Sequence, residues 1–489
     1  MLSFIEGACV MAAELLGAKM LAPYFGSSLY VWATVLAITL GGLAIGYFAG
    51  GELSYRSKNK FSLFYVLLIG SAFMIAMPFS SKFLLHYLQS SKLIPSLLFS
   101  GACFLLPPVI MMGMVSPLLI DSLSGDKKDA GRMAGTVYAI STVGGIVATF
   151  LLGFYVIPEF GLTLPAIIFG CLLALIPAYV LLKNKKFKLL ILVSSVCIVL
   201  SSFHKPKAPS DIKTLYSAEG LLGQLLVVDY PVYEKSKIKY YSRILFCNRI
   251  IQTVSTPKDS LQPTLPYIQK ITNELSALKK GSTVLLLGLG GGALANQLTT
   301  MGHQIDAVEF DNRMVAVAKK YFELNPDIDI ENDDARHYLN ACSKKYDVII
   351  FDLFKGEENP NHVLTIESLN KAKMLLNPGG QLVLNGNGYL QGKIGRGMRS
   401  IYKTFNAAGF SVKTLTTGPD EAYRNALYFA TLHRQNTLGE YIDTTDALVL
   451  LDEFPVLDIL NKEANRAWRL GYIQNSIRNF EQRNVPIFD

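Results

Sequence analysis

The residues in this chain that could do chemistry are glycines and acidic residues that follow apolar segments in its second half. One apolar segment, VLLL, runs directly into a turn that contains Gly288, Gly290 and Gly292. Glycine permits a tight turn and lets the backbone approach a ligand closely. Glu309 follows the next apolar segment, about 20 residues further on, where an acid can hold two ribose hydroxyls. The order of strand, turn, helix, strand and acid predicts a nucleoside-binding site.

Two further acidic residues follow later apolar segments. Asp334 stands in the run NDDAR, where a carboxylate can accept a hydrogen bond from an adenine amino group. The alternative for Asp334 is an N-terminal cap on the helix expected over ARHYL. Asp352 ends the apolar segment YDVIIFD, and ligands bind at the carboxyl ends of strands in open α/β sheets. Asp352 is therefore the best candidate for a catalytic residue.

Alternating strands and helices are expected to position these residues. From Gly281 onward the chain alternates between short apolar segments and amphipathic ones, which predicts a doubly wound, Rossmann-like α/β domain of the methyltransferase type. We place this domain at residues 263–489, with a helical extension at its C-terminal end. Residues 211–262 hold short alternating segments that are typical of a small β-strand subdomain.

The first part of the chain, residues 1–203, differs from the rest in charge. It holds 20 charged side chains, whereas residues 204–489 hold 64. Only 17% of the whole chain is charged, below the roughly one quarter typical of soluble proteins. The composition therefore excludes a single soluble domain, a disulfide scaffold and a disordered chain, and favours a membrane domain followed by a soluble half. Apolar stretches of spanning length predict six crossings, near residues 3–23, 28–52, 61–79, 93–120, 132–157 and 161–182.

The distribution of positive charge predicts the side of the membrane on which the soluble half lies. Lysine and arginine gather after the second, fourth and sixth apolar stretches, so we place these loops and the N-terminus in the cytoplasm. Most of the net charge of +8 then lies beside the lipid bilayer, where it favours anionic headgroups. A seventh apolar segment, residues 189–203, is short for a crossing of about 30 Å. We favour a seventh segment that does not cross, which keeps the soluble half cytoplasmic.

Three ionisable residues lie within the first apolar stretch. They are Glu6, Glu14 and Lys19, and such groups are costly in lipid. They suggest a cation or proton site. The alternative is that Glu6 lies near the interface and that Glu14 pairs with Lys19 or with another helix.

Metal and nucleic-acid partners are not indicated. The six cysteines have no metal-ligand or redox spacing such as C-x-x-C, so we expect reduced cysteines and no metal. The soluble half has no basic stripe with interleaved aromatic residues, so we expect no nucleic acid.

The second half resembles the spermidine synthases, the polyamine aminopropyltransferases, over roughly residues 211–435. VLLLGLGGGALA resembles the family's glycine-rich turn, VEFD its ribose-binding acid, NDDAR its adenine-contacting acid and YDVIIFDLFKG its active-site strand. LLGQLLVVD and RILFCNRIIQT resemble two segments with substrate-contacting glutamines, here Gln224 and Gln252. Membrane segments followed by such a domain look like a bacterial subgroup of fused membrane and spermidine synthase proteins. The resemblance implies an integral protein of the bacterial inner membrane, and it is compatible with a homodimer.

The chain departs from this family at residues that hold the amine substrate. Gly291 and Asn248 stand where the family usually has Asp, and Lys355 stands where it has the Asp that deprotonates the attacking amine. Gly223 replaces a tyrosine, and the family's stretch with tyrosine and histidine is hard to find in TPKDSLQPTLPYIQK. A diamine needs carboxylates to hold it and a base to take its proton. We therefore expect this chain to retain the family's nucleoside site and to have an altered amine site.

These features predict an enzyme that uses S-adenosylmethionine or decarboxylated S-adenosylmethionine as a substrate. Attack on the chain carbon beside the sulfonium would transfer an aminopropyl-type group to a small amine and release methylthioadenosine. Holding the two reactants in the right position would supply most of the rate acceleration. Three alternatives stay open: a lyase in which the donor closes a ring on itself, a methyltransferase, and a nucleoside sensor or transporter without catalysis.

Overall fold

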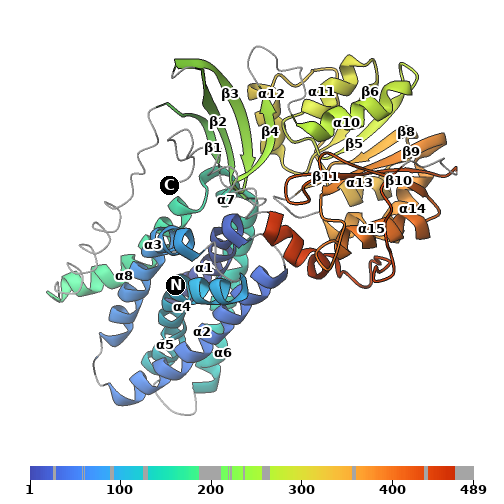
Figure 1. The fold of residues 1–489 in the computed structure, drawn as a ribbon. Coiled ribbons are helices and arrows are strands. Elements are labelled where there is room, and N and C mark those ends of the chain that lie inside the picture. Colours follow the sequence, from blue (N-terminus) through green and yellow to red (C-terminus); the bar gives the residue numbers. More distant parts are fainter. Residues whose placement is uncertain are drawn as a thin grey trace. The chain divides into compact units, whose positions relative to one another are not determined.

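The structure is a computed structural model of the 489-residue chain. It describes residues 1–25, 29–57, 59, 61–88, 93–124, 130–186, 211–218, 220, 223–234, 237–255, 265–354, 360–433 and 439–468. The chain forms two compact units (Figure 1). The first unit comprises Met1–Lys207 with Ala218–Gln224, and the second comprises Ala208–Ser217 with Leu225–Asp489.

The first unit is helical in its described part. Its long helices are apolar along most of their length, and many of their large apolar side chains remain exposed. The helices are α1 (Leu2–Phe25), α2 (Leu29–Arg56), α3 (Ser62–Leu88), α4 (Leu93–Gly113), α5 (Val115–Leu123), α6 (Ala130–Leu151), the π-helical turn η2 (Leu152–Val156), α7 (Ile157–Phe160) and α8 (Thr163–Lys183).

Small residues allow α1 and α6 to lie in close contact. A Cβ atom on Gly7 would overlap the carbonyl oxygen of Ser141, and one on Gly144 would overlap that of Phe4. Glycine thus brings two helix backbones together, as in helix pairs packed in membranes. The same kind of approach joins α2 to α4, where a Cβ on Gly46 would lie 2.5 Å from the carbonyl oxygen of Ile110.

Five helical segments in the described part are long and apolar enough to cross a bilayer. The segments are Val31–Arg56, Ser62–Leu85, Pro95–Leu123, Ala130–Val156 and Thr163–Lys183. They correspond to the second to sixth crossings expected from the sequence. The first expected crossing forms α1, which is not among the five and carries Glu6, Glu14 and Lys19. The seventh apolar segment, residues 189–203, lies outside the described residues.

The second unit begins with a small antiparallel sheet in the order β1-β2-β3-β4. Alternating apolar residues on β2 and β3 face helix α12 (Asn312–Tyr321), and Val227 and Leu245 pack there with Val317. The strands are β1 (Lys213–Ala218), β2 (Leu225–Glu234), β3 (Lys237–Cys247) and β4 (Ile250–Ser255). The small sheet and the α/β domain therefore share one hydrophobic core region.

A seven-stranded sheet in the order β10-β11-β9-β8-β5-β6-β7 forms the centre of the second unit. Strands β7, β6, β5, β8 and β9 run parallel, and β11 pairs antiparallel with both β9 and β10. The strands are β5 (Thr283–Leu287), β6 (Gln304–Val308), β7 (Asp329–Glu331), β8 (Tyr346–Phe351), β9 (Leu376–Asn387), β10 (Ser411–Thr416) and β11 (Asn425–Thr431). This topology confirms the expected Rossmann-like α/β domain of the methyltransferase type.

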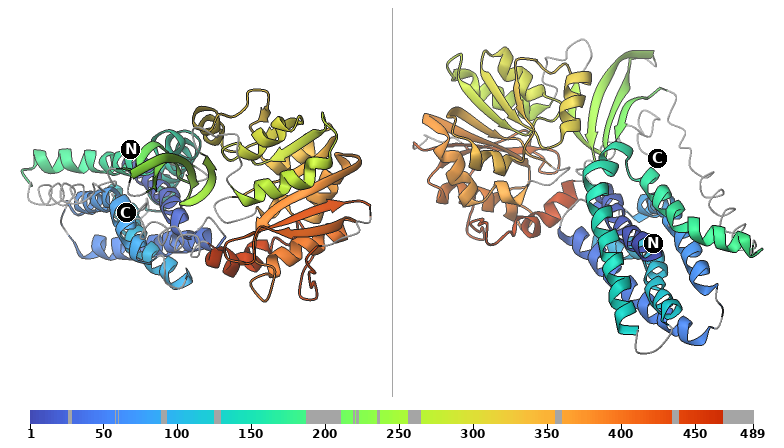
Figure 2. Two further views of the ribbon diagram at one scale, coloured as in Figure 1. Left: turned by 45° about the horizontal axis from the view of Figure 1, so that its top comes forward. Right: turned by 180° about the vertical axis from the view of Figure 1, so that it is seen from behind.

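Helices cover both faces of this sheet, as Figures 1 and 2 show. Helices α10 (Pro266–Glu274), α11 (Ala293–Thr300) and α12 pack on one face, and α13 (Ala335–Ala341), α14 (Ile366–Met374) and α15 (Arg396–Ala407) pack on the other. The central strands are buried on both faces, which explains their continuous apolar sequences.

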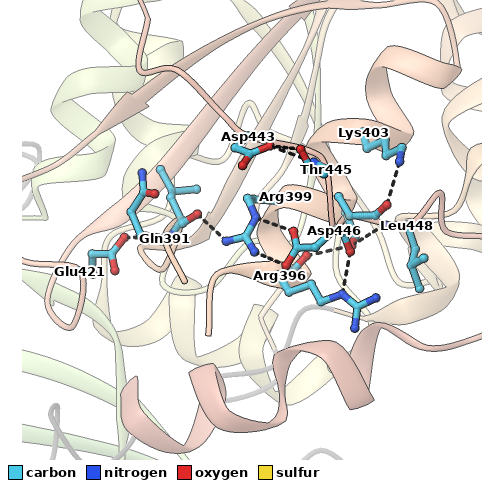
Figure 3. A network of polar contacts seen from close by, with 12 residues as sticks. Gln391, Arg396, Arg399, Lys403, Glu421, Asp443, Thr445, Asp446 and Leu448 are labelled. Atoms are coloured by element: carbon cyan, nitrogen blue, oxygen red, sulfur yellow. Dashed lines mark hydrogen bonds and ion pairs between the residues drawn. The ribbon is translucent and has the colours of Figure 1, made fainter. Parts of the chain in front are cut away.

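The C-terminal part of the second unit differs in part from the helical extension expected there. Residues 439–456 are irregular, and a helix follows over 457–468. A polar network holds the irregular part against α15 (Figure 3). Arg399 forms an ion pair with Asp446 at 2.6 Å and donates to the carbonyl oxygen of Leu390, and Lys403 donates to that of Ala447. Through Asp446 and Ala447, these contacts attach the irregular segment to α15.

Candidate active site

The glycine-rich turn lies between β5 and α11. Gly288, Gly290 and Gly292 all have positive φ angles, of 93°, 55° and 81°, which disfavour other residues. A Cβ on Gly288 would overlap the carbonyl oxygen of Asp352, so the turn passes directly over the end of β8. The expected tight turn with close backbone approach is therefore present, and it lies beside Asp352.

Glu309 follows β6 at the same edge of the sheet. One carboxylate oxygen accepts a hydrogen bond from the amide of Leu289 at 3.1 Å, and the other accepts one from Asp311 at 2.8 Å. Burial raises the pKa of the Glu309 carboxyl above its ordinary value, and these amides oppose that shift. The side chain thus links the end of β6 to the glycine-rich turn.

Asp334 caps helix α13 in the structure. Its Oδ1 accepts hydrogen bonds from the amides of Arg336 and His337 at 2.9 and 3.1 Å, and its Oδ2 lies 3.2 Å from His362 Nε2. Partial burial alone would raise the pKa of Asp334, but the amide of His337 and the His362 side chain outweigh it and lower the pKa. The capping role weighed from the sequence is therefore present, and a role in adenine binding stays a prediction.

Asp352 lies at the carboxyl end of β8, where two side chains from other elements donate hydrogen bonds to it. Tyr267 of α10 donates its hydroxyl to Oδ2 at 3.1 Å, and Asn385 of β9 donates its amide to Oδ1 at 2.8 Å. Burial raises the pKa of the Asp352 carboxyl, and both hydrogen bonds act against that shift. Because each carboxylate oxygen has one donor, the side chain is held in one orientation.

Thr253 of β4 occupies the space beside Gly291, where the family has an Asp. Its hydroxyl accepts a hydrogen bond from the amide of Gly291 at 2.9 Å. A Cβ on Gly291 would lie 2.8 Å from three atoms of the Thr253 side chain. Position 291 thus lacks the family's carboxylate, and the side chain of Thr253 leaves no room for another side chain there.

The two glutamines expected to contact substrate lie in different surroundings. Gln252 is half-buried on β4 at a β-bulge, because the pairing register passes from Thr253 to Ile251 and skips it. Such bulges redirect side chains near functional sites. Gln224 is half-buried directly before β2, in the segment that groups with the first unit. Both remain predicted substrate contacts.

Three residues of this site were not found from the sequence. Tyr267 lies in the stretch where the tyrosine of the diamine segment was sought, directly after the proline that begins α10. The tyrosine directly after this proline was the feature of the sequence that could have identified Tyr267 as a site residue. Asn385 carried no signal, because it reaches the site through the pairing of β9 with β8. Thr253 reaches it because β4 of the small sheet contacts the glycine-rich turn. Lys355, expected to replace the family's base, lies outside the described residues.

Two further features lie close to Asp352 and Asn385 in the sequence. Asn387, two residues after Asn385 on β9, is fully buried, and its Nδ2 has no hydrogen-bond partner among the described residues. Phe354 stacks on Trp468 of the C-terminal helix, with ring centroids 6.4 Å apart.

Within the described part of the chain, no group of three or more His, Cys, Asp or Glu side chains could hold a metal ion.

The second unit is similar to known proteins over part of its length. Residues 267–434 match the spermine/spermidine synthase domain family. A polyamine aminopropyltransferase of Vibrio vulnificus is 34% identical over 127 residues, which cover 24% of this chain and 42% of that protein. An eEF1A lysine and N-terminal methyltransferase homolog of Drosophila melanogaster is 32% identical over 115 residues, which cover 21% of this chain and 17% of that protein.

Solved structures resemble the chain only distantly. The spermidine synthase of Thermotoga maritima has 15% identity and a TM-score of 0.35, and the match covers 51% of this chain and 88% of that chain. The chain spans less than half the length of the curated relatives named above. The similarity is thus to the spermine/spermidine synthase domain, and it lies within the second unit.

Proposed function

We propose that the second unit is a spermidine synthase-like transferase that cleaves an adenosyl sulfonium and releases methylthioadenosine. The observation that supports this most is that the glycine-rich turn, Glu309 and Asp352 meet at the carboxyl ends of neighbouring parallel strands. Ligands of open α/β sheets bind at that edge. The match of residues 267–434 to the spermine/spermidine synthase domain favours the same class of reaction.

Glu309 and the glycine-rich turn would hold the nucleoside. The Glu309 carboxylate already accepts hydrogen bonds from the backbone amides of Leu289 and Asp311, and the amide of Gly290 bonds it as well. Ribose hydroxyls would therefore share its oxygens with these amides or replace one of them. At Asp334, an adenine amino group would compete with His362 for Oδ2, since Oδ1 caps α13.

The reaction would be a displacement at the carbon beside the sulfonium. A nitrogen lone pair of the acceptor forms the new C–N bond, the C–S bond breaks, and its electron pair stays on sulfur as the neutral thioether of methylthioadenosine. The attacking ammonium must first lose a proton, and the new secondary ammonium then carries the positive charge that the sulfonium had, so one proton is released overall. Asp352 would hold the donor's amino group or take a proton, because its raised pKa suits a buried proton acceptor.

The surroundings of Gly291 bear on the choice of donor. The family's acid at this place would repel the carboxylate of intact S-adenosylmethionine, and here Thr253 lies beside an unsubstituted glycine. We therefore propose that both the intact and the decarboxylated donor fit, with a small amine as acceptor.

Replacing Asp352 tests this assignment. Asp352→Asn keeps the size of the side chain and removes its charge, so we expect turnover to fall by at least about 100-fold. We expect the affinity for methylthioadenosine, measured by calorimetry, to change less than tenfold. Asp347→Asn is the matched control at the opposite end of β8, where Asp347 binds Asn377 and Thr283. Full activity in Asp352→Asn would show that the catalytic assignment is wrong.

The first unit would anchor this enzyme in a bacterial inner membrane, with the second unit in the cytoplasm. Its five apolar helical segments support this proposal by length and composition. A cysteine introduced at position 440 tests the orientation in intact cells. We expect protection from a membrane-impermeant maleimide, and labelling before lysis would place the second unit outside.

A further inference from the structure

A cavity of about 340 Å³ lies within the first unit, among α1, α2 and α6. Volumes of this size hold small organic ligands rather than single ions or waters. Its lining consists of Glu6, Gly7, Val10, Met11, Leu43, Tyr47, Ser141, Thr142, Gly145, Ile146, Thr149 and Phe150. All of these residues belong to the helical unit, and none takes part in the adenosyl site.

Glu6 is the charged residue in this lining. Its side chain is only 2% exposed, and Ser141 donates a hydrogen bond to Oε2 at 2.9 Å. The ion pairs found among the described residues do not include Glu6. A buried carboxylate without a cationic partner is costly, and in a helical membrane unit such a group marks a ligand or ion pathway.

The packing of α1 on α6 fixes Glu6 at the cavity wall. Gly7 follows Glu6 directly, and its missing side chain lets the backbone of α1 touch Ser141. The hydrogen bond from Ser141 then lies at the same contact. Glu6 is thus held where two helices meet, with little freedom to turn toward solvent.

The rest of the lining is mainly apolar, and its other polar side chains are the hydroxyl of Tyr47 and two threonines that are already hydrogen-bonded. Thr142 and Thr149 donate their hydroxyls to carbonyl oxygens four residues earlier on α6, those of Tyr138 and Gly145. Apolar side chains make up much of the remaining wall. The cavity therefore offers one carboxyl group, that of Glu6, inside a mainly hydrocarbon surface.

One side of the cavity faces outward along α6. Ile146 and Phe150, four residues apart on that helix, line the cavity and are 52% and 61% exposed. A ligand could therefore enter between them from the apolar surroundings of α6. A metal ion fits these features poorly, because hard cations require six or more oxygen ligands.

We propose that this cavity binds an organic molecule with a single positive charge and a hydrocarbon body, such as a protonated primary amine, with Glu6 as its counter-ion. The apolar wall would bury the hydrocarbon part, and Glu6 with Ser141 would take the ammonium group. A molecule with two fixed charges would leave one of them without a partner in this wall.

Binding of radiolabelled 2-phenylethylamine to the full-length protein tests the proposal. The protein is held in non-ionic detergent and dialysed against empty micelles. We expect saturable binding at one site per chain, and at least tenfold weaker competition by 2-phenylethanol, which has a similar shape and no charge. Binding that does not saturate, or equal competition by the alcohol, would overturn the proposal even without any variant.

Two variants then locate the charge. We expect Glu6→Gln to weaken binding at least tenfold and Glu6→Asp to retain measurable binding. Glu14→Gln is the matched control, because Glu14 is a partly buried carboxylate on the same helix that does not line the cavity. Unchanged affinity in a folded Glu6→Gln protein, judged by its elution and melting temperature, would contradict the assignment.

Discussion

At the scale of single residues, the pKa of Asp352 depends on its burial and on the hydrogen bonds that side chains of other elements donate to it. Burial favours the protonated acid, whereas hydrogen bonds from Tyr267 and Asn385 favour the carboxylate. The balance of these effects decides at which pH the side chain carries charge. A tyrosine whose own pKa is raised well above its usual value by burial stays a donor throughout the working range.

Tyr267→Phe should therefore change the pH dependence of the enzyme in a defined direction. The substitution removes a hydrogen bond that lowers the pKa of Asp352, so that pKa rises further. We expect the acid limb of the kcat/KM profile to move to higher pH, with activity recovered on the alkaline side. Tyr338→Phe, whose hydroxyl binds that of Tyr346 away from this site, is the control. A shift toward lower pH, or an equal shift in both variants, would contradict the role of Tyr267.

At the scale of elements, the C-terminal segment is held by polar contacts rather than by helix formation. Arg399 is almost fully buried on α15 and forms two hydrogen bonds with Asp446, whose carboxylate remains partly exposed (Figure 3). This ion pair lowers the pKa of Asp446. Its contribution to stability is therefore present above the ordinary pKa of aspartate and is lost as the pH falls through the lowered value.

Asp446→Asn should destabilise the second unit, because it leaves the buried guanidinium of Arg399 without its anion. We expect a loss of about 1–2 kcal/mol near neutral pH, discounted for the exposure of the carboxylate. The difference from the unmodified protein should shrink in acid. Asp420→Asn is the control, since the Asp420 carboxylate accepts a hydrogen bond only from the amide of nearby Ala422 among the hydrogen bonds described for it. Equal melting temperatures for both variants across this pH range would refute the role of the pair.

The sequence predicted those elements whose signals are local. The glycine-rich turn and the positions of Glu309 and Asp352 follow from apolar strands that end in glycine or acid. Tyr267, Asn385 and Thr253 could not be predicted in the same way, because strand pairing and helix packing bring them to the site across 33 to 85 residues of chain. Of the expected C-terminal helical extension, residues 457–468 form a helix, whereas residues 439–456 are irregular and are attached to α15 by polar contacts.

At the scale of the whole molecule, the chain joins a helical unit to an α/β unit with different chemistry in each. The helical unit carries a buried carboxylate beside an apolar cavity, and the α/β unit carries two acids at the edge of a parallel sheet. We propose an organic cation as the ligand of the first arrangement and an adenosyl sulfonium as the ligand of the second. The two proposals rest on separate residues, so each can fail without the other.

The nucleoside product of the full-length protein tests the central proposal most directly. The purified protein is incubated with S-adenosylmethionine or its decarboxylated form, with and without putrescine, and the released nucleoside is identified by mass spectrometry. We predict methylthioadenosine, and its absence from the Asp352→Asn variant. Adenosylhomocysteine would instead indicate methyl transfer, and binding of the donor without any product would contradict an enzymatic role for the second unit.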